Sequence, residues 1–152
     1  MIEFNWNGEL LILMNVAIAA VLTGFIGLER EVKNKPAGFR TNMIVGASAA
    51  LLLSLGEILV ENYIQDGLKD IIQPDPTRII EAIILGISFI GAGTILKASD
   101  ESKVYYLTTA ATVLFSAGIG IAVALEQYIL AVMATLLLLI INRVAKIIYQ
   151  NV

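Results

Sequence analysis

The chain has 152 residues, of which 58% are hydrophobic and only 15% are charged, with a mean hydropathy of +0.84 and a formal net charge of -3. Soluble domains contain nearer a quarter charged residues, so the composition excludes an ordinary soluble protein and indicates an integral membrane protein. Cysteine and histidine are both absent, which excludes disulfides, cysteine nucleophiles and the commonest general base. The sequence shows no phosphate-binding loop and no basic surface with interleaved aromatics, so we expect neither an enzyme nor a nucleic-acid-binding protein.

The first two predicted elements are membrane spans at about 10–28 and 41–60. The uncharged run 10–28 would form a helix about 28 Å long, which matches a hydrocarbon core of about 30 Å. No basic residue precedes this run, so it lacks the start of a cleavable signal peptide and is predicted to be a retained span. In the second span, Gly46, Ala50 and Ser54 recur every four residues and predict a face that packs closely against another helix.

The stretch GLEREVKNKPAGFRT, residues 27–41, joins these spans and holds the densest charge in the chain. Glu29 and Arg30 lie at the end of the first span, and Arg40 lies at the start of the second. A structural interpretation is a topology signal with an interfacial ion-pair network. The functional alternative is a docking surface or inner mouth, because ionisable groups near the apolar region of a bundle are functional candidates.

The third span, about 77–96, follows a polar segment at 61–75 that we interpret as an interfacial turn or short helix. Asp75 followed by proline is a typical helix start. In the structural interpretation Asp75 caps the helix and pairs with Arg78, and Glu81 also pairs with Arg78. In the functional alternative Asp75 and Glu81 form a carboxylate site for a hard cation such as Mg²⁺.

Small and hydroxyl-bearing residues distinguish the third and fourth spans, the latter predicted at about 104–125. Glycines at 86, 91 and 93 and threonines at 108, 109 and 112 favour close packing and hydrogen bonds between helices. The alternative is a third helix broken at Gly91–Gly93, with its carbonyl groups exposed to an ion. A leucine-rich fifth span at about 127–142 is predicted to lie on the lipid-facing outside of the bundle.

The distribution of basic residues predicts the orientation of the five spans. With the N-terminus outside, eight of the ten basic residues lie on the inner side, as the positive-inside rule requires. These are Arg30, Lys33, Lys35, Arg40, Lys97, Lys103, Arg143 and Lys146. We therefore predict an all-α polytopic membrane protein with a single transmembrane domain of five helices, its N-terminus outside and its C-terminus in the cytoplasm.

Ordered motifs give the chain a family resemblance. They are GLERE at 27–31, KPAGFRT at 35–41, DPTRI at 75–79, GISFIGAGTIL at 86–96 and LTTAATVLFSAGIG at 107–120. Together they resemble the MgtC/SapB family of membrane proteins over about residues 10–142. The chain departs from the family pattern at Tyr106, where glycine is usual, and near Leu114, where tryptophan is common. It resembles the short SapB-like form that lacks the C-terminal soluble domain of MgtC.

The resemblance implies a multi-pass protein of the bacterial inner membrane with a role in magnesium homeostasis, low-magnesium adaptation and virulence. For MgtC proper it implies inhibition of the F-type ATP synthase. We therefore expect a regulator that binds another membrane complex, assembled as a homo-oligomer with a dimer favoured. The alternative is a transporter or channel for Mg²⁺ or another ion. The residues expected to contribute to interaction or to a pore are Glu29, Arg30, Arg40, Thr41, Asp75, Arg78, Glu81, Gly91, Gly93, Thr108 and Thr109.

Overall fold

The computed structural model describes residues 6–65, 75–98 and 105–150, which form five α-helices. Their bounds are α1 Trp6–Val32, α2 Phe39–Gln65, α3 Thr77–Ala98, α4 Leu107–Ala124 and α5 Tyr128–Gln150. The first four are long and apolar enough to cross a membrane, and α5 has a shorter apolar stretch, Tyr128–Val144. The all-α prediction is confirmed. Most of the predicted interfacial segment at 61–75 lies outside the described residues, although its first five residues continue α2.

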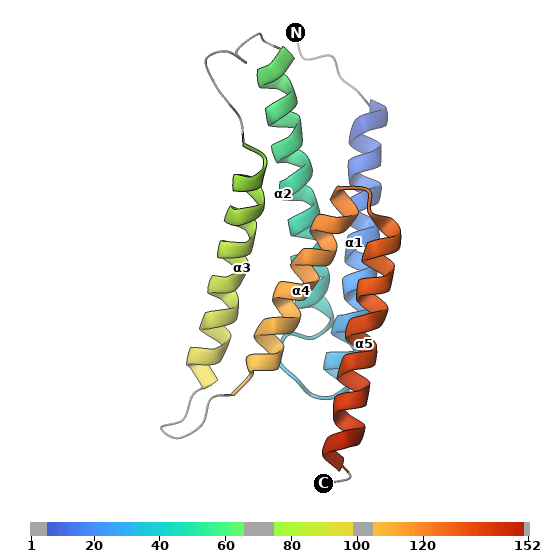
Figure 1. Cartoon of the computed structure of the whole chain (residues 1–152), viewed down its shortest axis with the longest axis vertical. Helices are drawn as coiled ribbons and strands as arrows, with labels where there is room; N and C mark the ends of the chain where they lie inside the picture. The colour runs from blue at the N-terminus through green and yellow to red at the C-terminus, as the bar shows by residue number, and fades with distance from the viewer. Residues whose placement is uncertain (1–5, 66–74, 99–104, 151–152) are drawn as a thin grey trace.

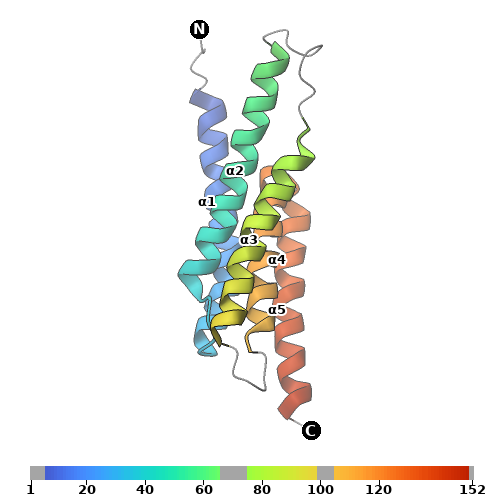
Figure 2. The same ribbon diagram turned by 90° about the vertical axis from the view of Figure 1, so that its left-hand side faces the viewer.

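The helices run along the long axis of the molecule, and α1 begins at the end opposite to the one where α5 ends (Figure 1). The centre of the bundle is formed by α1, α2 and α4, which all contact one another. At one edge α3 packs mainly on α4, and at the other edge α5 packs on α1 and α4 (Figure 1). Figure 2, turned by 90°, shows α3 standing in front of this centre.

Small residues bring α2 and α4 into close contact. Gly120 of α4 lies so near α2 that an added Cβ would overlap the carbonyl oxygen of Gly46 and would lie 3.0 Å from the Cβ of Ala49. The predicted packing face of α2 is confirmed, because Gly46, Ala50 and Ser54 are all buried. Glycine lets two helix backbones approach where any side chain would separate them.

The loop between α1 and α2 is tight, and a hydrogen bond between the ends of the two helices closes it. Asn34 and Ala37 have positive φ angles of 51° and 55°, an uncommon conformation for residues with a side chain. The Glu31 carboxylate accepts a 2.8 Å hydrogen bond from the Phe39 N–H. A carboxylate at this position satisfies a free donor at the start of α2 and complements the helix dipole.

The alternative of a third helix broken at Gly91–Gly93 is wrong, because α3 is continuous from Thr77 to Ala98. Its hydrogen-bonded backbone therefore exposes no row of carbonyl groups. The prediction that the glycines of α3 pack closely holds within the described residues only for Gly91, where an added Cβ would meet Ala110 at 3.3 Å. At Gly86 and Gly93 an added Cβ would meet nothing within 4 Å.

The position of α5 agrees with its leucine-rich sequence. Among its residues with described side chains only Ala131, Thr135 and Leu138 are buried. A helix that buries a narrow stripe of side chains lies at the periphery of a bundle. The predicted outer position of the fifth span is therefore confirmed.

Candidate functional site

Polar side chains gather at the end of the bundle that carries the α1–α2 loop, the first turn of α4 and the C-terminal half of α5. We call this end the basic end. Arg30, in the last turn of α1, has only 5% of its surface exposed. Its Nη2 donates a 2.7 Å hydrogen bond to Oγ1 of Thr109, which is also buried and lies in the first turn of α4. Two residues that the sequence places in separate motifs thus meet inside the bundle.

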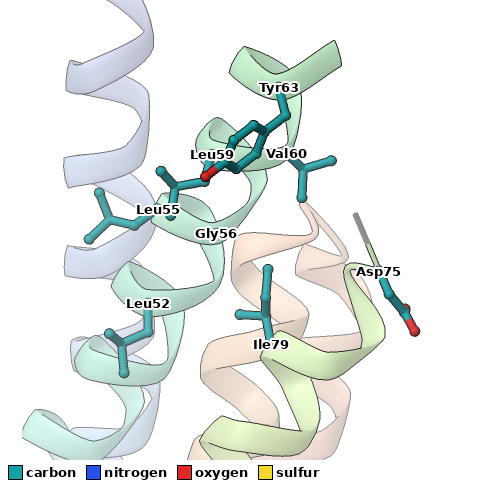
Figure 3. Close-up of a pocket in the computed structure, with 8 residues that line it drawn as sticks. All are labelled: Leu52, Leu55, Gly56, Leu59, Val60, Tyr63, Asp75 and Ile79. Atoms are coloured by element: carbon teal, nitrogen blue, oxygen red, sulfur yellow. The ribbon is translucent and has the colours of Figure 1, made fainter. Parts of the chain in front are cut away.

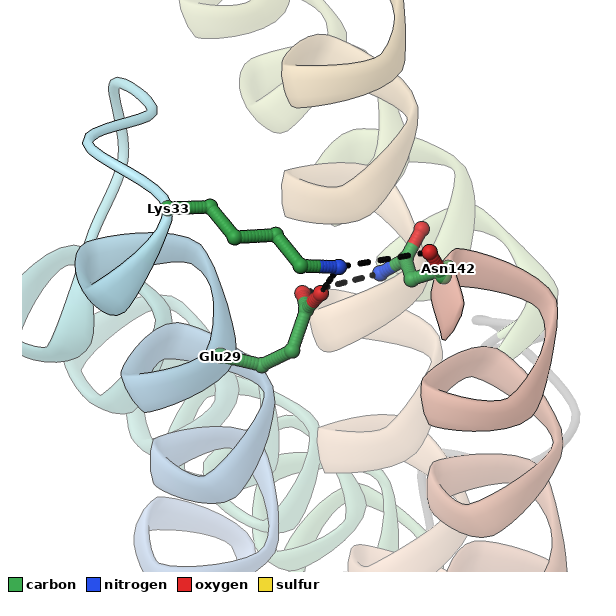
Figure 4. A network of polar contacts seen from close by, with 3 residues as sticks. All are labelled: Glu29, Lys33 and Asn142. Carbon is green, nitrogen blue, oxygen red and sulfur yellow. Dashed lines mark hydrogen bonds and ion pairs between the residues drawn. The ribbon is translucent and has the colours of Figure 1, made fainter. Parts of the chain in front are cut away.

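Next to this pair, Glu29 joins α1 to α5 (Figure 4). One carboxylate oxygen of Glu29 forms an ion pair with Lys33, one helical turn further on. The other accepts a 3.2 Å hydrogen bond from the side-chain amide of Asn142, and Lys33 Nζ donates to the Asn142 carbonyl oxygen at 3.2 Å. An ion pair therefore forms at this end, but Glu29 makes it with Lys33, and within the described residues neither Arg30 nor Arg40 takes part as expected. The polar contacts also reach α5. Asn142 was not among the expected residues.

A second polar cluster ties the start of α2 to α4. Asn42 is fully buried and donates to the carbonyl oxygens of Ala37 at 2.6 Å and Gly38 at 3.0 Å. Its side-chain oxygen accepts a 2.8 Å bond from the Ser116 hydroxyl. The amide thus fixes the loop and the contact of α2 with α4 together. Sequence reasoning missed this pair, although both residues lie within the quoted family motifs or directly beside them.

Three other expected residues at the basic end are exposed. Arg40, Thr41 and Thr108 all lie at the surface near the α1–α2 loop or the start of α4. The Thr108 carbonyl oxygen accepts a 2.7 Å bond from the Thr112 hydroxyl, which therefore serves its own helix. Of the threonines predicted to bond across helices, Thr109 does so.

At the opposite end of the bundle, Asp75 has the structural role that was predicted for it. Its Oδ1 accepts hydrogen bonds from the Thr77 N–H at 3.0 Å and the Thr77 hydroxyl at 2.6 Å, and its other oxygen lies 3.8 Å from Arg78 Nε. Glu81 is exposed, and the pair it was expected to form with Arg78 is not among the described ion pairs. Within the described residues no three metal-binding side chains come together. A site for Mg²⁺ at Asp75 and Glu81 stays a prediction.

The Asp75 cap predicts a pH dependence. The hydrogen bonds from the Thr77 side chain and backbone lower the pKa of Asp75, and Arg78 lowers it further. Because folding lowers the pKa of Asp75, its carboxylate stabilises the start of α3. This stabilisation is complete at pH values above the ordinary aspartate pKa of about 3.9, and it is lost as the pH falls through the lowered pKa. We expect the Thr77 amide resonance to titrate with a midpoint below about 3.9 in an NMR pH series. Asp75→Asn should abolish that titration; its persistence would contradict the assignment.

An open groove of about 500 Å³ lies between α2 and α3 near Asp75 (Figure 3). Its lining is apolar apart from Asp75 and the Tyr63 hydroxyl, and consists of Leu52, Leu55, Gly56, Leu59, Val60, Tyr63, Asp75 and Ile79. Figure 3 shows the Asp75 carboxylate pointing away from the groove. Such a lining suits a hydrocarbon chain better than a hydrated cation.

Long apolar helices whose buried arginine and polar contacts gather at one end define a polytopic α-helical membrane protein. Within that class, the chain belongs to the MgtC family, whose profile matches residues 16–151. The match covers both the Arg30–Thr109 pair and the Glu29–Lys33–Asn142 network.

Relatives of known name support this assignment. The chain is 31% identical to the putative magnesium transporter YhiD of Escherichia coli over 87% of its own length and 59% of the relative. It is 35% identical to protein SapB of Bacillus subtilis over 90% of its length and 57% of the relative. It is 36% identical to protein MgtC of Salmonella typhimurium over 86% of its length and 50% of the relative. The chain therefore spans between half and three fifths of these relatives, and no solved structure matches it.

Proposed function

We propose that this protein is a regulator in magnesium homeostasis that binds another protein complex within the membrane, and that α3 is the docking helix. The observation that carries the proposal is the outward face of α3. Among the four long apolar helices, α3 is the least covered by the rest of the chain. Only 11% of its most apolar 18-residue stretch is buried, against 33–50% for the other three. Leu85 and Phe89 on α3 are 73% and 81% exposed.

The two open glycines suit this face to a second helix. Gly86 and Gly93 are seven residues apart, which places them on the same side of α3 after about two turns. An added Cβ at either position meets nothing in the chain, so neither glycine serves internal packing. In membranes, glycine at a helix surface permits close contact with a neighbouring helix. The F-type ATP synthase, which the family resemblance implies, is the first partner to test, and a second copy of this chain is the other.

Photo-crosslinking from two equally exposed positions on different helices tests the docking helix. A photoreactive residue at Phe89 of α3 is expected to capture a membrane protein in cells, because the partner helix covers that position. The control is Ile129 of α5, which is equally exposed at 84% and should capture only lipid. Gly86→Leu should strongly reduce capture from Phe89 without unfolding the chain, since its side chain enters open space. Equal protein capture from both positions would contradict the proposal, and capture of a second copy alone would indicate only the predicted dimer.

The second candidate function is transport of Mg²⁺, which the name of the Escherichia coli relative supports. Flux into liposomes that contain the purified chain separates the two functions. A regulator is expected to give no uptake of Mg²⁺ above that of empty liposomes. Robust uptake that is lost in Asp75→Asn would overturn the regulator proposal.

A further inference from the structure

The Arg30 guanidinium is a buried cation whose hydrogen-bonding capacity is only partly used. The group has five N–H donors, and Thr109 accepts one of them at 2.7 Å. Arg30 Nε is fully buried and has no hydrogen-bond partner among the described residues. A buried donor without a partner is costly, and more so when it carries charge.

No carboxylate in the described part of the chain forms an ion pair with Arg30. Glu29 is next to it in sequence, but the Glu29 carboxylate binds Lys33 and Asn142 (Figure 4). The other acid near the end of α1, Glu31, accepts a hydrogen bond from the Phe39 N–H. Both local acids are therefore engaged elsewhere, and neither forms an ion pair with Arg30.

The side chain of Arg30 is directed at a second positive feature, the N-terminus of α4. This helix is preceded by Tyr106 in a left-handed conformation, with φ 64° and no side-chain cap. Its first backbone bond comes from the Ala110 N–H to the Tyr106 carbonyl oxygen, so the N–H groups before it have no partner within the helix. These groups carry the partial positive charge of the helix dipole. The Thr108 hydroxyl is exposed in the same turn.

We propose that Arg30 and the first turn of α4 bind a phosphate group. A guanidinium matches phosphate oxygens with parallel N–H bonds, and a helix N-terminus offers backbone donors to the same anion. The Thr108 hydroxyl, in the same first turn, would supply a further donor. The phosphate belongs to a lipid headgroup or to free phosphate, since the site lies at the end of a membrane-spanning bundle. This inference does not depend on the proposed regulatory function.

The test uses the full chain in a phosphate-free maltoside detergent, with inorganic phosphate and phosphatidic acid in mixed micelles as separate probes. At least one probe is expected to raise the Tm saturably and to shift the Arg30 Nε–Hε resonance in ¹⁵N NMR. A response to phosphatidic acid alone assigns the site to a lipid headgroup, and a response to both assigns it to the phosphate group itself. No shift with either probe would overturn the proposal.

Two variants and a control make the assignment specific. Arg30→Gln should lose the saturable rise in Tm, whereas Arg40→Gln, which removes an exposed arginine at the same end, should keep both that rise and the shift of the Arg30 Nε–Hε resonance. Thr108→Val should weaken binding by about tenfold, the effect of losing one hydrogen bond to a charged group. If Arg30→Gln does not fold, Thr108→Val decides, because its altered side chain is exposed. An unchanged affinity in Thr108→Val, or a full response in folded Arg30→Gln, would contradict the site.

Discussion

A Gly120→Ala variant is expected to unfold at a clearly lower temperature than the parent protein. The added methyl group would overlap the carbonyl oxygen of Gly46 and press on Ala49, and neither backbone can rotate away as a flexible side chain could. Overpacking typically costs about 1–3 kcal/mol, and we expect the upper part of that range because the obstacle is backbone. Thermal unfolding followed by circular dichroism in detergent measures the loss.

Gly118→Ala is the matched control, because it adds the same methyl group two residues earlier in α4. A Cβ at Gly118 would meet nothing within 4 Å. Alanine also has a higher helix propensity than glycine by about 1 kcal/mol, so the control should be as stable as the parent or slightly more stable. Equal Tm values for the two variants would show that α2 and α4 do not meet at Gly120.

Asn42→Leu is expected to cost about 1–3 kcal/mol in free energy of unfolding. Leucine removes the amide that binds the carbonyl oxygens of Ala37 and Gly38 and the hydroxyl of Ser116. The Ser116 hydroxyl is fully buried, so it cannot exchange the lost bond for one to water, whereas the carbonyl groups of Ala37 and Gly38 are partly buried and can do so in part. The loop and the start of α2 should loosen together.

A double-mutant cycle with Ser116→Ala isolates the bond between α2 and α4. If that bond exists, Asn42→Leu and Ser116→Ala together should cost less than the sum of the single variants by about 1 kcal/mol. Ser48→Ala is the control for loss of a hydroxyl in α2, since Ser48 is half-buried and makes none of these bonds. Strict additivity of Asn42→Leu and Ser116→Ala would argue against the observed contact.

The five helices could be predicted from the sequence because the signal is local. An uncharged run as long as the hydrocarbon core forms a helix wherever it lies, since its backbone groups must bond internally. The ends were less predictable: α2 begins at Phe39 and reaches Gln65, beyond the predicted span 41–60. The extra turns are amphipathic or charged, and hydropathy alone does not mark where a helix stops after leaving the apolar region.

Some members of the candidate site could be predicted from the sequence, but their contacts could not. Motif resemblance marked both Arg30 and Thr109, yet they are 79 positions apart, and no periodicity relates residues on different helices. Asn142 lies outside the quoted motifs, and its hydrogen bond to Glu29 exists only because α5 packs beside the end of α1. The α3 glycines have the same motif signal but different surroundings. Gly91 packs within the chain, whereas Gly86 and Gly93 face outward.

The sequence by itself determined the class of protein, the five long helices of the described residues, the small-residue face of α2 and the cap at Asp75. Each of these follows from run length, spacing or neighbouring residues, which operate over a few turns of one helix. Only the tertiary structure decided that Arg30 is buried against Thr109, that Asn42 bonds Ser116 and that α3 leaves one face uncovered. These depend on which helix faces meet, and that is set by packing among distant segments.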